Sequence, residues 1–78
     1  VSNKPLPSAE MYDILEDKMG NKWIASDVGV FKITGNHVEH YTTQNGLEED
    51  VIVKFFEGND NKIWVAGISG TLSFIQND

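Results

Sequence analysis

The stretch Lys22-Trp23-Ile24-Ala25-Ser26 decides the fold, because the chain repeats it as Ile63-Trp64-Val65-Ala66-Gly67. Trp64 minus Trp23 is 41, and the same offset separates the two alanines. Other identical pairs at this offset are Leu6 and Leu47, Glu16 and Glu57, Gly29 and Gly70, and Asn36 and Asn77. Similar pairs are Met11 and Ile52, Ile14 and Phe55, Leu15 and Phe56, Ile24 and Val65, Phe31 and Leu72, and Ile33 and Phe74. The chain therefore contains an internal repeat.

The length of the repeat predicts the architecture. Repeats of ~40–45 residues with several short strands are typical of β-propeller blades, small sheets that bury their faces against neighbouring blades. Apolar runs separated by turn residues predict strands over residues 11–16, 22–26, 30–34 and 37–43, then over 51–57, 63–67 and 71–75. We expect an all-β propeller fragment with a complete four-stranded antiparallel blade and about three strands of a second. Its expected parts are a lead-in (1–10), the first blade (11–43), a connector (44–50) and the incomplete blade (51–78).

Composition excludes several classes of partner. The 78 residues include six lysines, no arginine and twelve acidic residues, so the net charge is −6. An acidic chain without guanidinium groups is poorly suited to nucleic-acid phosphates or to an anionic membrane surface. Cysteine is absent, and no apolar run reaches the ~18–20 residues of a membrane helix. The chain opens on Val1 and stops partway through the second repeat, so we expect it to be a segment of a longer protein.

Two repeated residue types invite a functional interpretation. Glu16 and Glu57 resemble a carboxylate pair, but a residue that returns in both copies is expected to serve each blade, here at a strand end or turn. Trp23 and Trp64 offer rings on which a sugar could stack. Their strands are so apolar that burial between blades is the better interpretation.

Polar residues in turns and on one strand suggest metal ligands. Asp17 and Asn21, with their counterparts in Asn59-Asp60-Asn61, lack the alternation ending in Glu that a calcium loop requires. His37 and His40 lie three positions apart on a predicted strand, so they point to opposite faces. We expect no metal site, and solvated histidines at the edge of the blade.

No catalytic motif emerges. The glycines stand singly in turns without the Lys-Ser/Thr pair of a phosphate loop, and Ser69-Gly70 lacks the pattern of a nucleophile elbow. The acidic run Glu48-Glu49-Asp50, with Asn45, could meet a polar ligand at a propeller face; the alternative is a solvated loop that aids solubility. The sequence thus assigns no catalytic, cofactor-binding, metal-binding or ligand-binding residue.

A family resemblance rests on an ordered set of residues. The first copy reads Asp17, Gly20, Trp23-Ile24-Ala25-Ser26, Gly29-Val30-Phe31, Tyr41-Thr42-Thr43 and Asn45-Gly46-Leu47, and the second continues with Glu57, Ile63-Trp64-Val65-Ala66-Gly67 and Gly70. From about Leu6 to Ile75, this pattern resembles the two-component regulator propeller repeat. The second copy departs at Gly58, which replaces Asp17, and at Asn61, which replaces Gly20.

The resemblance implies the periplasmic sensor region of a bacterial, Bacteroidetes-type sensor histidine kinase, an inner-membrane protein whose kinase core lies outside these residues. We therefore expect a non-catalytic, ligand-sensing segment with a small-molecule or glycan ligand and no cofactor. The alternatives are a fragment of a carbohydrate-active propeller enzyme and a purely structural protein-interaction module. Because blade faces are apolar and the last strand leaves an unpaired edge, the isolated chain is expected to self-associate or exchange strands.

Overall fold

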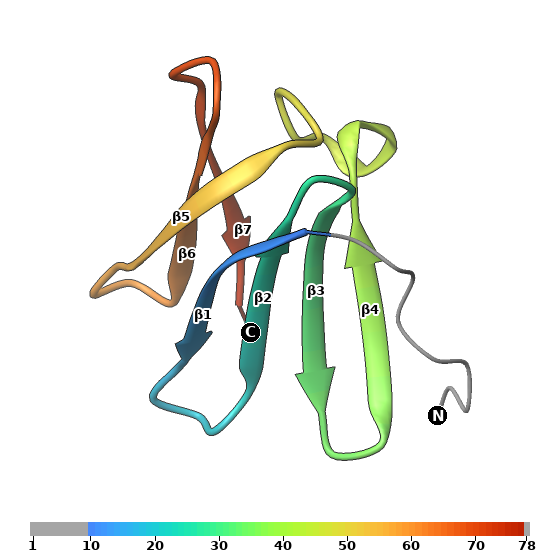
Figure 1. Cartoon of the computed structure of the whole chain (residues 1–78). Helices are drawn as coiled ribbons and strands as arrows, with labels where there is room; N and C mark the ends of the chain where they lie inside the picture. The colour runs from blue at the N-terminus through green and yellow to red at the C-terminus, as the bar shows by residue number, and fades with distance from the viewer. Residues whose placement is uncertain (1–9, 78) are drawn as a thin grey trace.

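A computed structural model describes residues 10–77 as two antiparallel sheets (Figure 1). Neighbouring strands in the first sheet are β1 (Met11–Glu16), β2 (Lys22–Ser26), β3 (Gly29–Thr34) and β4 (His37–Tyr41). The second sheet contains β5 (Ile52–Glu57), β6 (Lys62–Gly67) and β7 (Leu72–Gln76). The predicted fold class is confirmed: an all-β propeller fragment with a four-stranded blade and three strands of a second. Most of the predicted lead-in, including Leu6, lies outside the described residues, as does position 78.

The fourth strand ends earlier than predicted, at Tyr41 instead of Thr43. Thr42 caps a short 3-10 turn, η1 (Thr43–Asn45): its hydroxyl accepts a hydrogen bond from the Gln44 N–H at 3.1 Å. The Asn45 side chain in turn accepts from the Thr42 N–H at 2.9 Å. Two consecutive threonines favour a strand by propensity, but this reciprocal cap turns the chain toward the second sheet.

Details of the backbone repeat together with the sequence. A β-bulge adds Tyr12 to β1 and Val53 to β5, and Val53 minus Tyr12 is again 41. The two turns that follow are closed alike, by the hydrogen bonds Asp17 N to Asn21 O (2.9 Å) and Gly58 N to Lys62 O (2.8 Å). The left-handed residue in each turn also recurs, at Gly20 (φ 86) and Asn61 (φ 61). The internal repeat is thus a repeat of structure, and Asn61 replaces Gly20 without changing the turn.

The offset is not constant, which corrects the sequence alignment of the third strands. Trp23 lies opposite Lys32, whereas Trp64 lies opposite Phe74, and Phe74 minus Lys32 is 42. The turn after β6 is one residue longer than the turn after β2, since Gly67 pairs with Thr71 while Ser26 pairs directly with Gly29. The predicted pairs Phe31–Leu72 and Ile33–Phe74 are therefore wrong, because a shift of one residue moves every side chain to the other face.

The core lies between the two sheets, where β5 crosses β1 and β2 (Figure 1). Trp23 is fully buried there, with Tyr41 stacked on it at 6.1 Å and Phe55 of the second sheet edge-on at 6.3 Å. The buried apolar residues of this core are Trp23, Ala25, Val30, Leu47, Ile52, Phe55, Ile63, Val65 and Ile75. Burial of a tryptophan and several branched side chains between the sheets holds them face to face.

The prediction that both tryptophans are buried between blades is half right. Trp23 is buried, whereas Trp64 is only half-buried on the opposite side of the second sheet. The two rings hold the same register position, since Leu15 lies opposite Trp23 and Phe56 opposite Trp64. What differs is the neighbour: the second sheet covers Trp23, and none of residues 10–77 forms a further sheet over Trp64.

Candidate functional site

The two sheets meet around the carboxylate of Asp17, which follows β1 and is 4% exposed. Its Oδ1 accepts hydrogen bonds from the backbone N–H groups of Met19 and Asn21, both at 2.9 Å. Its Oδ2 accepts from Trp23 Nε1 at 2.8 Å, from Asn77 Nδ2 at 2.8 Å and from Asn21 Nδ2 at 3.2 Å. Because Asn77 follows β7, one carboxylate joins the first turn to the end of the second sheet.

These donors set the ionisation of Asp17. Burial by itself would raise the pKa, but hydrogen bonds from Trp23, from Asn21 and from Asn77 outweigh it, and the pKa of Asp17 falls from 3.8 to about 2. The group is therefore an anion at neutral pH. Two carboxylate oxygens that already accept five hydrogen bonds have no lone pair left for a metal ion, so this turn serves as a structural joint.

The matching turn of the second sheet lacks this joint. Gly58 stands at the position of Asp17, so the acceptor of the tryptophan N–H is missing from that position. A Cβ on Gly58 would lie 3.3 Å from Trp64 Nε1, which shows that the turn and ring keep the same relative placement. The second tryptophan is thus held less firmly than Trp23.

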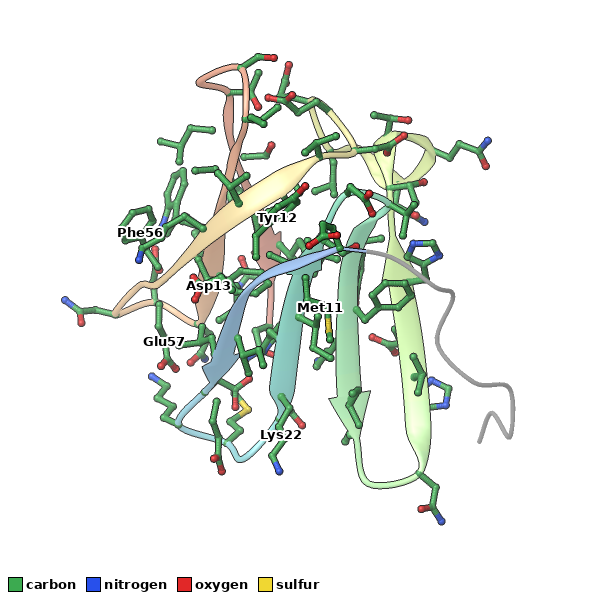
Figure 2. The ribbon with its side chains drawn as sticks, viewed as in Figure 1. Met11, Tyr12, Asp13, Lys22, Phe56 and Glu57 are labelled. Carbon is green, nitrogen blue, oxygen red and sulfur yellow. The ribbon has the colours of Figure 1, made fainter. Side chains whose placement is uncertain are left out.

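Two further carboxylates link the sheets (Figure 2). Asp13 Oδ2 accepts from the Phe55 N–H at 3.0 Å, and Glu57 Oε2 accepts from the Lys18 N–H at 2.9 Å. The expectation that Glu57 is a structural residue at a strand end is confirmed, while Glu16 is exposed at the end of β1. Sequence reasoning misses the roles of Asp13 and Asp17 because the partners that join the two sheets, Phe55 and Asn77, are distant in the chain.

The histidines of β4 make separate contacts. His40 stacks on Phe31 with ring centroids 4.3 Å apart, and its Nε2 lies 2.6 Å from the Val28 carbonyl oxygen. His37 Nε2 lies 3.5 Å from Glu39 Oε2 on the surface. Both histidines are exposed on the edge strand β4, so the prediction of solvated edge histidines is confirmed, and His40 in addition rests on the Phe31 ring. Across residues 10–77, no three His, Cys, Asp or Glu side chains gather in a way that could hold a metal ion.

Two of the three carboxylates in the acidic run of the connector form hydrogen bonds within the chain. Glu49 Oε2 accepts from Thr71 Oγ1 at 2.6 Å, and this hydrogen bond lowers the pKa of Glu49. Asp50 Oδ1 accepts from the Thr43 N–H at 2.8 Å. These two carboxylates fasten the connector to the turns beside it, and only Glu48 extends an exposed carboxylate. The interpretation as a polar ligand site is thereby weakened.

The second sheet carries an uncovered aromatic surface, on the side that faces away from the first sheet; Figure 2 shows Phe56 there. Cross-strand pairing sets Phe56, Trp64 and Phe74 side by side, with the last two ring centroids 5.1 Å apart. Phe56 is 52% exposed and Leu72 58%. This surface, the open face, consists of Phe56, Trp64, Ala66, Leu72 and Phe74. Contiguous exposed apolar residues are typical of a contact with another protein surface, so the open face is the candidate functional site.

Fold and site together define a segment of a stacked-sheet protein, a β-propeller fragment whose terminal faces are apolar. Comparison with protein-family models, with curated proteins and with solved structures finds no match. The helical content of residues 10–77 is one 3-10 turn, so these residues include no helix that could cross a membrane.

Proposed function

We propose that the chain is a non-catalytic segment of the extracytoplasmic β-propeller sensor of a two-component histidine kinase. The open face is the observation that supports this proposal. It corresponds to the surface of the first sheet that packs against the second sheet, but no further sheet of residues 10–77 covers it. A sheet with two apolar faces suits a place within a series of blades. The sensor role itself rests on the resemblance of the Trp strands, glycine turns and Asn-Gly-Leu connector to the regulator propeller repeat.

In this proposal, the propellers of a dimer exist in two arrangements, and ligand binding raises the population of one of them. The full-length membrane protein transmits this change to its kinase core. The carboxylates of Asp13, Asp17 and Glu57 support a rigid coupling between blades, because each accepts a hydrogen bond from the other sheet. A rigid pair of blades moves as a unit, and a small ligand at a propeller face can then act at a distance.

The test uses the parent protein. The reading frame beyond Asp78 should encode further Trp strands, an apolar span of ~20 residues and a kinase core. Membranes that contain the intact protein should transfer phosphate from ATP to a histidine, at a rate altered by polysaccharide breakdown products. Glycan cleavage by the intact protein, abolished by one acidic substitution, would instead establish the enzyme alternative.

The exposed aromatic rings of the open face also favour a second candidate, a purely structural interaction module. Phe56, Trp64 and Phe74 suit a protein contact, and the Lys62 ammonium lies over the Phe74 ring, 4.7 Å from its centroid. Under this alternative, soluble glycan fragments would leave the melting temperature of the intact protein unchanged, whereas a sensor ligand would raise it by mass action.

A further inference from the structure

The contact between the two sheets provides a template for a second contact. In that contact, the front of the first sheet, made by Leu15, Trp23, Ala25 and Val30, packs against the back of the second sheet. The back of the second sheet contributes Ile52, Phe55, Ile63, Val65 and Ile75. Each of the two sheets therefore has a front and a back that differ in sequence and in role.

Both surfaces occur a second time, and no further sheet of residues 10–77 packs on either of them. The open face is the front of the second sheet, with Phe56, Trp64, Ala66 and Leu72 at the positions of the four front residues of the first. The back of the first sheet, here called the back face, presents Ile14, Ile24 and Ile33, while Phe31 on the same face is 4% exposed and stacks on His40. Ile14, which is 64% exposed, occupies the position of buried Phe55.

We propose that the open face of one copy of this chain binds the back face of a second copy. The second copy would then repeat the placement that the second sheet has on the first. Such a head-to-tail contact joins two different surfaces, so it extends the stack of sheets and can close only as a ring. The inference follows from the contact inside the chain and does not depend on a sensor role.

The new contact is weaker than the internal one, because three anchoring groups change. Gly58 replaces Asp17, Lys54 replaces Asp13, and Lys22 of the back face replaces buried Ile63. One anchor is retained, since Glu16 stands at the position of Glu57. Association is therefore expected to be reversible. The net charge of −6 on each copy opposes it, so added salt should strengthen it by screening the repulsion.

The test measures molar mass by sedimentation over a range of concentrations, at about 0.5 M salt, where the Debye length is only a few ångströms. The natural chain should grow in mass with concentration. Trp64→Ala, which removes the central ring of the open face, and Ile14→Lys, which charges the back face, should each remain monomeric. Ile68→Lys is the matched control, because Ile68 is 63% exposed but lies in the turn after β6.

The decisive sample is a mixture of the two monomeric variants. Trp64→Ala keeps an intact back face and Ile14→Lys keeps an intact open face, so the mixture should form one-to-one dimers that grow no further. Circular dichroism and unfolding midpoints of each variant verify that it is folded. The proposal is overturned if the natural chain stays monomeric at high concentration, if Ile14→Lys associates like the natural chain, or if the mixture of folded variants stays monomeric.

Discussion

Trp23 and Trp64 stand at the same position of two copies of one blade, yet only the first is enclosed. Trp23 is fully buried, donates its indole N–H to Asp17 and contacts Tyr41 and Phe55. Trp64 is half-buried beside Phe74. The strand, the register and the turn before it are alike, so the difference shows that the environment of a blade residue is set by the neighbouring sheet.

The comparison predicts that replacing Trp23 by alanine lowers the stability of the chain much more than replacing Trp64 by alanine. Trp23→Ala should lower the free energy of unfolding by about 3–5 kcal/mol, because it leaves a cavity in the core and removes a donor from Asp17. Trp64→Ala should cost about 1 kcal/mol, since the ring is partly in water already. Urea unfolding followed by circular dichroism checks both. Equal losses would contradict the assignment of one enclosed and one open front.

The turn glycines after the two tryptophan strands offer a second contrast. A Cβ on Gly29 (φ 104) would fall on the Tyr41 carbonyl oxygen, whereas a Cβ on Gly70 (φ 88) meets no atom within 4 Å. Both substitutions carry the penalty of left-handed backbone, so Gly70→Ala should cost about 1 kcal/mol and Gly29→Ala about 3 kcal/mol. Thermal unfolding of the two variants measures the difference. A larger loss from Gly70→Ala would show that the longer second turn is wrongly placed.

Asp17→Asn tests the joint between the sheets. It removes the negative charge and turns an amide toward groups that already donate, so we expect a loss of about 2 kcal/mol. Asp60→Asn is the matched control in the second turn, where Asp60 is exposed and contacts Lys62 Nζ at 3.2 Å. This substitution should leave the free energy of unfolding nearly unchanged, because water screens an exposed ion pair. The denaturant midpoints of the two variants measure the two losses of stability. Equal losses would show that Asp17 does not anchor the two sheets.

The carboxylate of Asp17 also makes the stability of the chain depend on pH in the acid range. Its pKa is about 2 in the folded chain against 3.8 ordinarily, so its contribution is complete above about pH 4 and is lost as the pH falls toward 2. The difference corresponds to about 2 kcal/mol. Unfolding measured at intervals between neutral pH and pH 2 should show the natural chain and Asp17→Asn converging. Parallel curves would mean that Asp17 titrates normally.

Much of this architecture is predictable from the sequence, because strand alternation, turn residues and the repeated Trp strand all depend on local order. The extra residue in the second turn was missed for a physical reason. Gly29 and Gly70 both occupy left-handed turn positions, so an alignment at an offset of 41 matches them although the strands that follow are displaced by one residue.

The joint and the open face escape sequence reasoning for a different reason. Asp17 and Asn77 are sixty positions apart, and their contact exists only once the sheets are stacked. Asp17 looks like an ordinary turn residue, and the indole donor six positions later was the one available signal. Likewise, Trp64 carries the same sequence signature as Trp23, so its exposure depends on which sheet lies beside it and not on its own strand.

Fluorescence quenching of single-tryptophan variants tests the difference between the two fronts most directly. In Trp23→Phe at low concentration and low salt, the remaining Trp64 should emit at long wavelength and be quenched strongly by acrylamide. In Trp64→Phe, the remaining Trp23 should emit at short wavelength and be quenched weakly, because the second sheet covers it. Equal quenching of the two rings in folded monomers would contradict the account.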